Sequence, residues 1–109
     1  MHCYQQYHLV VAWFQSFEDS LASARGILNS HEIDVIHRIT LLFHSLAPRS
    51  DKALIKKFLK KVKSFFLDLL DLGVVLLKRE FQFLDLKLLV INARCLLLEL
   101  VYFLFLWFS

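Results

Sequence analysis

Apolar residues recur along the chain at intervals of three and four, the spacing that places them on one face of an α-helix. The first series predicts a helix over about residues 8–28, and its members are Val10, Phe14, Phe17, Leu21, Ala24 and Leu28. A second helix is predicted over about 31–47. Asn29 and Glu32 have the spacing of a capping box at its start, and Pro48 ends it.

A third helix is predicted over about 51–72, because Ser50 and Asp51 form a typical helix start. Its apolar positions are Ile55, Leu59, Val62, Phe66 and Leu69. Most of the lysines of this segment fall on the opposite side of the predicted helix. Gly73 is the only break signal between this helix and the C-terminus, and it is either a C-cap that separates this helix from the last one or merely a weak point.

The last helix is predicted over about 74–108, a stretch without Gly or Pro. Its apolar residues keep a four-three step through Leu77, Phe81, Leu84, Leu88, Ile91, Cys95, Leu98, Tyr102 and Phe105. Polar residues recur every seven positions along two lines of this helix. One line contains Lys78, Asp85, Asn92 and Glu99, and the other contains Glu80, Lys87 and Arg94. At 100° per residue, the two lines lie about 160° apart around the helix axis. The helix therefore has two apolar faces divided by thin polar seams, and a chain of this size does not easily cover both. A strand over 81–88, where apolar and polar residues partly alternate, is the alternative.

The expected fold class is thus all-α: a single domain over 1–109, with three or four helices and a long hydrophobic C-terminal helix. Composition agrees, since 58% of the 109 residues are hydrophobic, with 24 Leu and 11 Phe but only 2 Gly and 1 Pro. These values exclude a disordered chain, a disulfide scaffold and turn-rich sandwiches or barrels.

The net charge of +3 is unevenly distributed. Six lysines without an intervening acid lie between positions 52 and 63: Lys52, Lys56, Lys57, Lys60, Lys61 and Lys63. A basic amphipathic helix of this kind can lie on an anionic membrane surface, and these lysines are the predicted contacts. An ordinary bundle helix with solvated lysines, or a peptide for a calmodulin-type groove, remains an alternative for 52–70. Nucleic acid is not an expected partner, because neither Arg nor an aromatic platform accompanies the lysines.

The segment 88–108 has 21 residues, enough to span a bilayer. Its Leu, Ile, Val and Phe residues favour insertion by about 4–8 kcal/mol, whereas Arg94 and Glu99 each oppose it by about 2.5–3.5 kcal/mol. Together with Asn92 they form the polar seam of the predicted insertion helix, and the sum is near zero. The other basic residues all precede this segment, so an inserted chain would keep its N-terminal side in the cytosol.

No residues are expected to catalyse a reaction or to bind a cofactor or a metal ion. His37 and His44 are seven positions apart, too far to hold one zinc ion together. The sequence contains no Gly-x-Ser-x-Gly, paired-cysteine or phosphate-loop motif. The chain is therefore expected not to be an enzyme and not to bind a small-molecule substrate.

The expected function is that of a small non-enzymatic, membrane-associated helical protein, and two alternatives stand beside it. One is a soluble helical module that self-associates as a homo-oligomer. The other is the product of a spurious or antisense reading frame with no evolved function. Fifty of the 109 residues are Phe, Leu, Ile, Met or Val, whose codons all have T as the second base. On the opposite strand these codons would specify mainly Lys, Glu, Gln, Asn and Asp. The heptad-spaced polar residues would there become apolar residues, which gives the pattern of a charged coiled coil. The nucleotide sequence of the opposite strand would test this alternative.

Overall fold

The computed structural model describes the backbone of residues 2–44 and 52–108, and the side chains of 8–44, 56 and 60–106. Within these residues the chain forms α1 (His2–Ala24), the short 3-10 helix η1 (Arg25–Ile27), α2 (Ser30–His44), α3 (Lys52–Leu76) and α4 (Leu84–Phe108). No strand occurs in this described part. The all-α prediction and the long apolar C-terminal helix are therefore confirmed, and the strand alternative over 81–88 is wrong.

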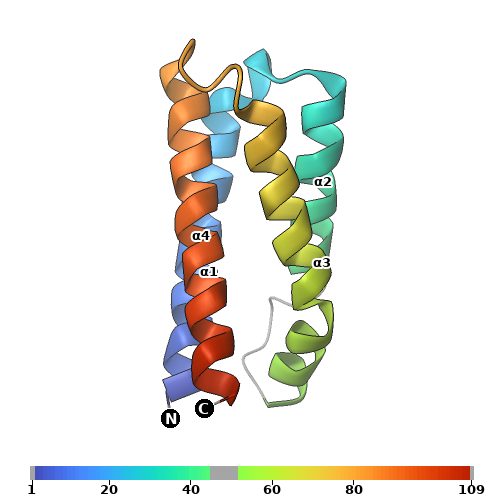
Figure 1. Ribbon diagram of the computed structural model, residues 1–109, viewed down its shortest axis with the longest axis vertical. Coiled ribbons are helices and arrows are strands. Elements are labelled where there is room, and N and C mark those ends of the chain that lie inside the picture. Colours follow the sequence, from blue (N-terminus) through green and yellow to red (C-terminus); the bar gives the residue numbers. More distant parts are fainter. Residues whose placement is uncertain (1, 45–51, 109) are drawn as a thin grey trace.

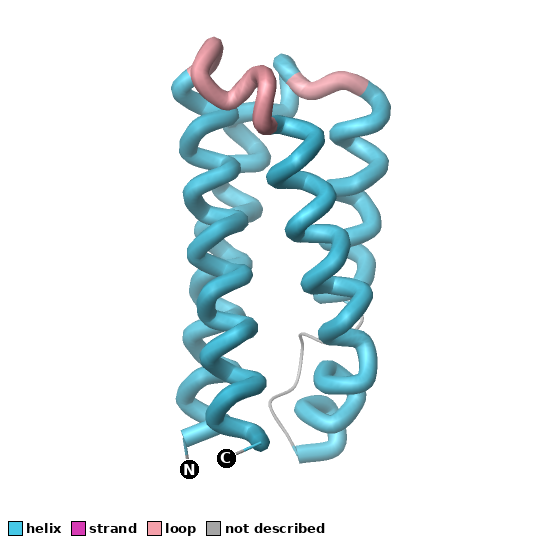
Figure 2. Tube along the Cα trace, in the orientation of Figure 1, coloured by secondary structure: helices cyan, strands magenta, loops and turns pink. Residues whose placement is uncertain are grey.

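The helices run up and down along a molecule of 41 × 21 × 20 Å. The closest helix pairs are α1 with α4, α2 with α3, and α3 with α4. Figure 1 shows α3 and α4 side by side on the near face, with α1 and α2 behind them. The link between α1 and α2 and the turn before α4 lie at the same end of the bundle (Figure 2). Because α3 and α4 have 25 residues each, they extend about 37 Å and run the length of the molecule.

An aromatic cluster fills the centre of the core. The ring of Phe14 stacks on that of Phe43 with centroids 3.9 Å apart, and Phe65 lies 5.8 Å from Phe43. The predicted apolar face of the first helix is confirmed from Val10 to Ala24, because all five of its members are buried. Among the described side chains of α3 and α4, the buried ones are Val62, Phe65, Leu69, Leu72, Leu76, Leu86, Leu89, Val90, Ala93, Leu96, Leu100 and Phe103.

The predicted boundary between helices at Gly73 is wrong, because Gly73 is not a C-cap. Gly73 lies inside α3, which continues to Leu76, and the chain turns over 77–83 before α4 begins at Leu84. Leu76 is fully buried, so packing against the core carries the helix through the glycine. The predicted helix over 74–108 therefore loses its first ten residues to the end of α3 and to the turn.

The other predicted boundaries shift as well. The first helix begins at His2 rather than near residue 8, and its α-helical part ends at Ala24 before η1. The second helix extends from Ser30 to His44 in the described residues, and its predicted end before Pro48 lies outside them.

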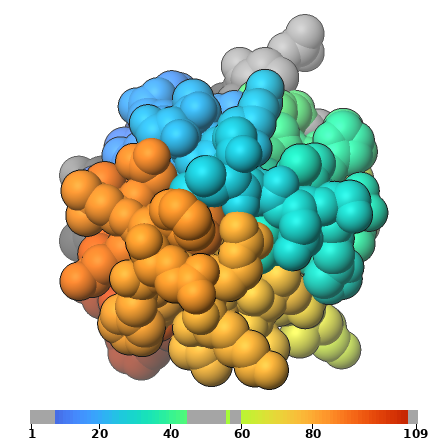
Figure 3. Space-filling model, turned by 90° about the horizontal axis from the view of Figure 1, so that it is seen from above, coloured from blue at the N-terminus to red at the C-terminus, as the bar shows by residue number. Residues whose placement is uncertain are grey.

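A buried polar cluster closes the end that carries the 77–83 turn. The predicted capping box is present: the Glu32 backbone N–H donates to Asn29 Oδ1 at 2.9 Å, and the Asn29 N–H donates to Glu32 Oε1 at 2.8 Å. The Arg79 guanidinium also donates to Glu32 Oε1 and to the Ile27 carbonyl oxygen. Arg79 thereby ties the turn to the start of α2, and Figure 3 shows these segments together at this end of the molecule.

Candidate interaction surface

The outward side of α4 carries an uninterrupted line of apolar and weakly polar residues, which we call the α4 stripe: Leu84, Leu88, Ile91, Cys95, Leu98, Tyr102 and Phe105. Six of its seven members are exposed, with Leu84 at 71%, Leu98 at 67% and Phe105 at 68% relative exposure. The opposite face of α4 packs into the core. The four-three series seen in the sequence is thus the solvent-facing side of this helix.

The outward side of α3 changes character along its length. In its first half the exposed residues include Lys56, Lys60 and Lys63, whereas in its second half Leu67, Leu70 and Val74 occupy the same side. Steps of three and four between these residues keep them on one face of the helix. The basic half lies beside the C-terminal end of α4, since α3 and α4 run in opposite directions (Figure 1).

Of the six lysines predicted to contact an anionic surface, the structure describes four side chains, and all four are exposed: Lys56, Lys60, Lys61 and Lys63. The side chains of Lys52 and Lys57 lie outside the described residues. The lysines face away from the buried side of α3, which contains Val62 and Phe65. The positive charge of this helix is therefore available to an external partner.

A groove of about 330 Å³ separates the outward sides of α3 and α4. It is lined by Leu69, Leu70, Gly73, Val74, Leu77, Val90, Ala93, Arg94 and Leu97. A side chain at Gly73 would meet nothing within 4 Å, so the groove is open at this point. The apolar surface therefore continues from the α4 stripe across to the second half of α3, with Arg94 as the charged residue between them.

The three predicted seam residues lie on both flanks of the α4 stripe. Asn92 faces α1, where its amide donates to the Ser20 hydroxyl, and Ser20 donates in turn to the Ser16 carbonyl oxygen at 2.7 Å. Arg94 lies on the α3 side, 3.5 Å from a carboxylate oxygen of Glu80. Glu99 is half-buried, and its Oε2 atom has no hydrogen-bond partner in the structure.

Among the described residues, α4 is the one helix whose length and apolar composition would let it cross a membrane, over Leu84–Leu106. The protein itself buries 33% of the residues in an 18-residue apolar stretch of this segment. The predicted two-faced helix is therefore found as a helix with one face in the core and the other in solvent.

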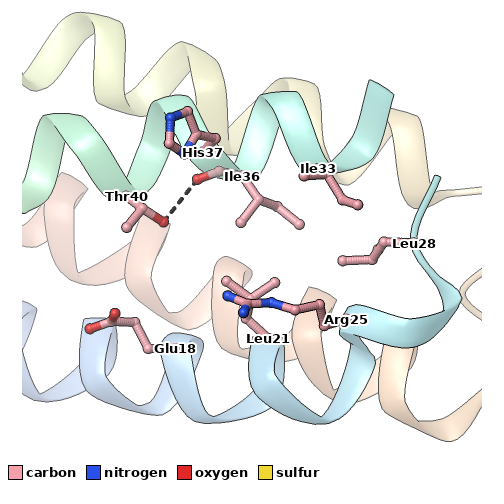
Figure 4. A pocket seen from close by; sticks show the side chains of 8 residues that line it. All are labelled: Glu18, Leu21, Arg25, Leu28, Ile33, Ile36, His37 and Thr40. Atoms are coloured by element: carbon pink, nitrogen blue, oxygen red, sulfur yellow. Dashed lines mark hydrogen bonds between the residues drawn. The ribbon is translucent and has the colours of Figure 1, made fainter. Parts of the chain in front are cut away.

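A second hollow, between α1 and α2, has a volume of about 210 Å³ (Figure 4). Leu21, Ile33 and Ile36 form its apolar wall, but its polar groups are partly engaged: the Thr40 hydroxyl donates to the Ile36 carbonyl oxygen at 2.9 Å. Small-molecule sites usually measure about 300–1,000 Å³. This hollow is thus a weaker candidate than the α3–α4 side.

One contact described above had no clear signal in the sequence. The Arg79 contact joins residues 47 positions apart, and no local motif marks it. In the described part of the chain, no three His, Cys, Asp or Glu residues gather in a way that could hold a metal ion.

No protein-family model matches the chain, and no significant match was found among curated proteins or solved structures. The surface itself is therefore the basis for the function proposed below.

Proposed function

We propose that the chain is a small, non-enzymatic, membrane-associated helical protein that binds an anionic lipid surface with its α3–α4 side. The observation that carries the proposal is the α4 stripe, which stays in solvent after the bundle has formed. Soluble monomers rarely expose large contiguous apolar patches, and such patches mark contacts with proteins or membranes.

The lysines on α3 support a lipid surface as the partner. Lys56, Lys60 and Lys63 are exposed residues of α3, which lies beside α4 on the same side of the bundle. An interfacial helix places its apolar side chains at the acyl boundary and its basic side chains among the headgroups. Anionic lipids are enriched in the cytoplasmic leaflet, so this mode of binding keeps the chain, including its N-terminal side, in the cytosol.

Binding along the surface fits the bundle better than a transmembrane α4. A spanning helix would give up the packing of Leu89, Leu96 and Phe103 in the core. It would also bring Asn92 and Glu99 into hydrocarbon, where polar groups are expensive. Binding along the membrane surface leaves the core intact, because the apolar residues that it buries against lipid are those of the α4 stripe.

Flotation with lipid vesicles tests the proposal. The purified chain should float with vesicles that contain phosphatidylserine, and less with purely zwitterionic vesicles. The double variant Lys56→Gln, Lys60→Gln should bind about 30-fold more weakly, from roughly 1 kcal/mol for each lysine near the surface. The matched control is Arg25→Gln, Lys78→Gln, which removes the same charge from exposed positions at the other end of the bundle.

High salt should reproduce the effect of the lysine variant, because the Debye length falls to about 3 Å at 1 M. A wild-type chain that stays with the soluble fraction in the presence of phosphatidylserine vesicles would refute the proposed function. Equal losses in the lysine variant and its control would refute the assignment to α3.

A further inference from the structure

The spacing of the α4 stripe is that of a coiled-coil seam. In heptad notation Leu88, Cys95 and Tyr102 occupy a positions, and Leu84, Ile91, Leu98 and Phe105 occupy d positions. This repeat runs through three heptads on the solvent side of a 25-residue helix. Two helices with such a repeat associate by inserting a and d side chains between those of the partner. We propose that a second copy of this chain covers the stripe, with the two α4 helices parallel and in register.

The charges beside the stripe favour the parallel orientation. The e positions hold Asp85, Asn92 and Glu99, whereas the g positions hold Lys87 and Arg94. In a parallel pair, each g residue faces the e residue five positions further along the partner. Arg94 of one copy then faces Glu99 of the other, twice by symmetry.

An antiparallel pair would place the same charges against their own kind. In that orientation e faces e and g faces g, so acidic residues meet acidic ones, and Lys87 and Arg94 meet basic ones. Like charges at these positions select against a pairing. The structure therefore points to one orientation of the second copy.

Arg94 is exposed in one copy, whereas the Oε2 atom of the half-buried Glu99 is buried and must turn outward to reach a second copy. The Arg94 side chain is 59% exposed, and its contact with Glu80 is long, at 3.5 Å. Glu99 Oε2 lacks a hydrogen-bond partner in the structure. A guanidinium from a second copy supplies the donor that this carboxylate lacks, after a rotation of its side chain.

A second copy and a lipid surface need the same stripe and therefore exclude each other. Only this competition rests on the proposed function; the parallel pair itself does not require a membrane. The chain then exists as a dimer in water and exchanges its partner copy for lipid at an anionic surface.

Cysteine cross-linking tests the orientation. Cys95 lies at an a position and faces its own counterpart in a parallel, in-register pair. The Cys3→Ser variant, which retains Cys95 alone, should form a disulfide-linked dimer under mild oxidation. With Cys3→Ser and Cys95→Ser, a single cysteine introduced by Leu88→Cys or by Tyr102→Cys should do the same. An antiparallel pair packs each a position against a d position of the partner, so neither position 88 nor position 102 would meet its own counterpart. Failure of both single-cysteine variants would therefore overturn the parallel register.

Sedimentation equilibrium tests the location. Leu98→Gln removes an exposed stripe residue and should weaken the dimer roughly 100-fold, since each dimer loses two buried leucines. Val74→Gln is the matched control, because Val74 is 70% exposed but lies on α3. Circular dichroism should show both variants as helical as the wild type. A wild-type chain that remains monomeric at its highest soluble concentration would overturn the inference, as would equal weakening by the two variants.

Anionic vesicles separate the inference from the proposed function. If both hold, adding phosphatidylserine vesicles should lower the yield of the Cys95 cross-link as protein moves to the lipid fraction. A dimer that persists while no protein floats would refute lipid binding and leave the dimer in place. A monomer that floats would refute the dimer and leave the lipid proposal in place.

Discussion

Replacing Arg79 tests how the closed end of the bundle is held. Its guanidinium donates to Glu32 and to the Ile27 carbonyl oxygen, and it is the cation that neutralises a carboxylate with 1% exposure. Arg79→Met keeps the apolar stem and removes the charge. The Glu32 carboxylate then remains buried with its capping contacts to Asn29 but without a counter-ion.

The expected cost follows from that burial. Removing one partner of a buried ion pair costs about 3–5 kcal/mol. The Arg79 side chain is 29% exposed, so water partly reaches the pair and the lower end applies. We expect a loss of about 2–3 kcal/mol in the free energy of unfolding, or roughly 10–20 °C in Tm for a domain of this size.

Replacing Glu32, the other partner of this ion pair, should reduce the free energy of unfolding by less. In Glu32→Gln the side-chain amide oxygen can still accept the Asn29 N–H, as in other capping boxes, and Arg79 can turn to water. We expect a loss of about 1.5 kcal/mol for the broken charge-assisted bond, the lower end of the range for such bonds. The double variant Arg79→Met, Glu32→Gln should lose less free energy of unfolding than the two single variants lose together. The difference should be about 1 kcal/mol or more.

Urea unfolding followed by far-UV circular dichroism measures all three variants. A change below about 0.5 kcal/mol in Arg79→Met would be ordinary for a surface position and would refute the role assigned to this residue. Strict additivity in the double variant would show that Arg79 and Glu32 act independently, against the contacts seen in the structure.

The remaining predictions concern one position in α3 and the core of the bundle. Gly73→Ala should stabilise the protein by about 0.8–1.0 kcal/mol, because Gly73 lies within α3 and an added Cβ meets nothing within 4 Å; an unchanged or lower unfolding midpoint would contradict this. Phe14→Ala should cost about 3–5 kcal/mol, because its ring is buried and stacked on Phe43. A loss below about 1 kcal/mol in urea unfolding would mean that the aromatic cluster is not the centre of the core.

Local patterns in the sequence predicted the features that depend on neighbouring residues. The capping box at Asn29 and Glu32 is such a case, because both of its hydrogen bonds join residues three apart. The buried face of α1 is another, since one stripe on that helix is clearly more apolar than the rest. In both cases the identity and spacing of these residues are enough to predict the feature.

Features that depend on distant residues were not predictable in the same way. The heptad repeat continues through Leu77 and Phe81, yet the chain turns there, and Arg79 within the turn contacts residues near the start of α2. On α4 the sequence indicated two apolar faces, but both have similar hydrophobicity. Only the packing of α1 and α3 against Leu89, Leu96 and Phe103 decided which face is buried.

The close packing of α1 against α4 has a consequence for synthesis of the chain. These two helices make the most extensive helix contact in the molecule, yet they stand at opposite ends of the sequence. About 60 residues separate Ala24 from Leu84, which a ribosome translates in roughly 3–12 s at 5–20 residues per second. During that interval the side of α1 that packs against α4, which includes Ser20, has emerged without the helix that covers it. Newly made chains should therefore depend on chaperone protection until the C-terminal helix is released.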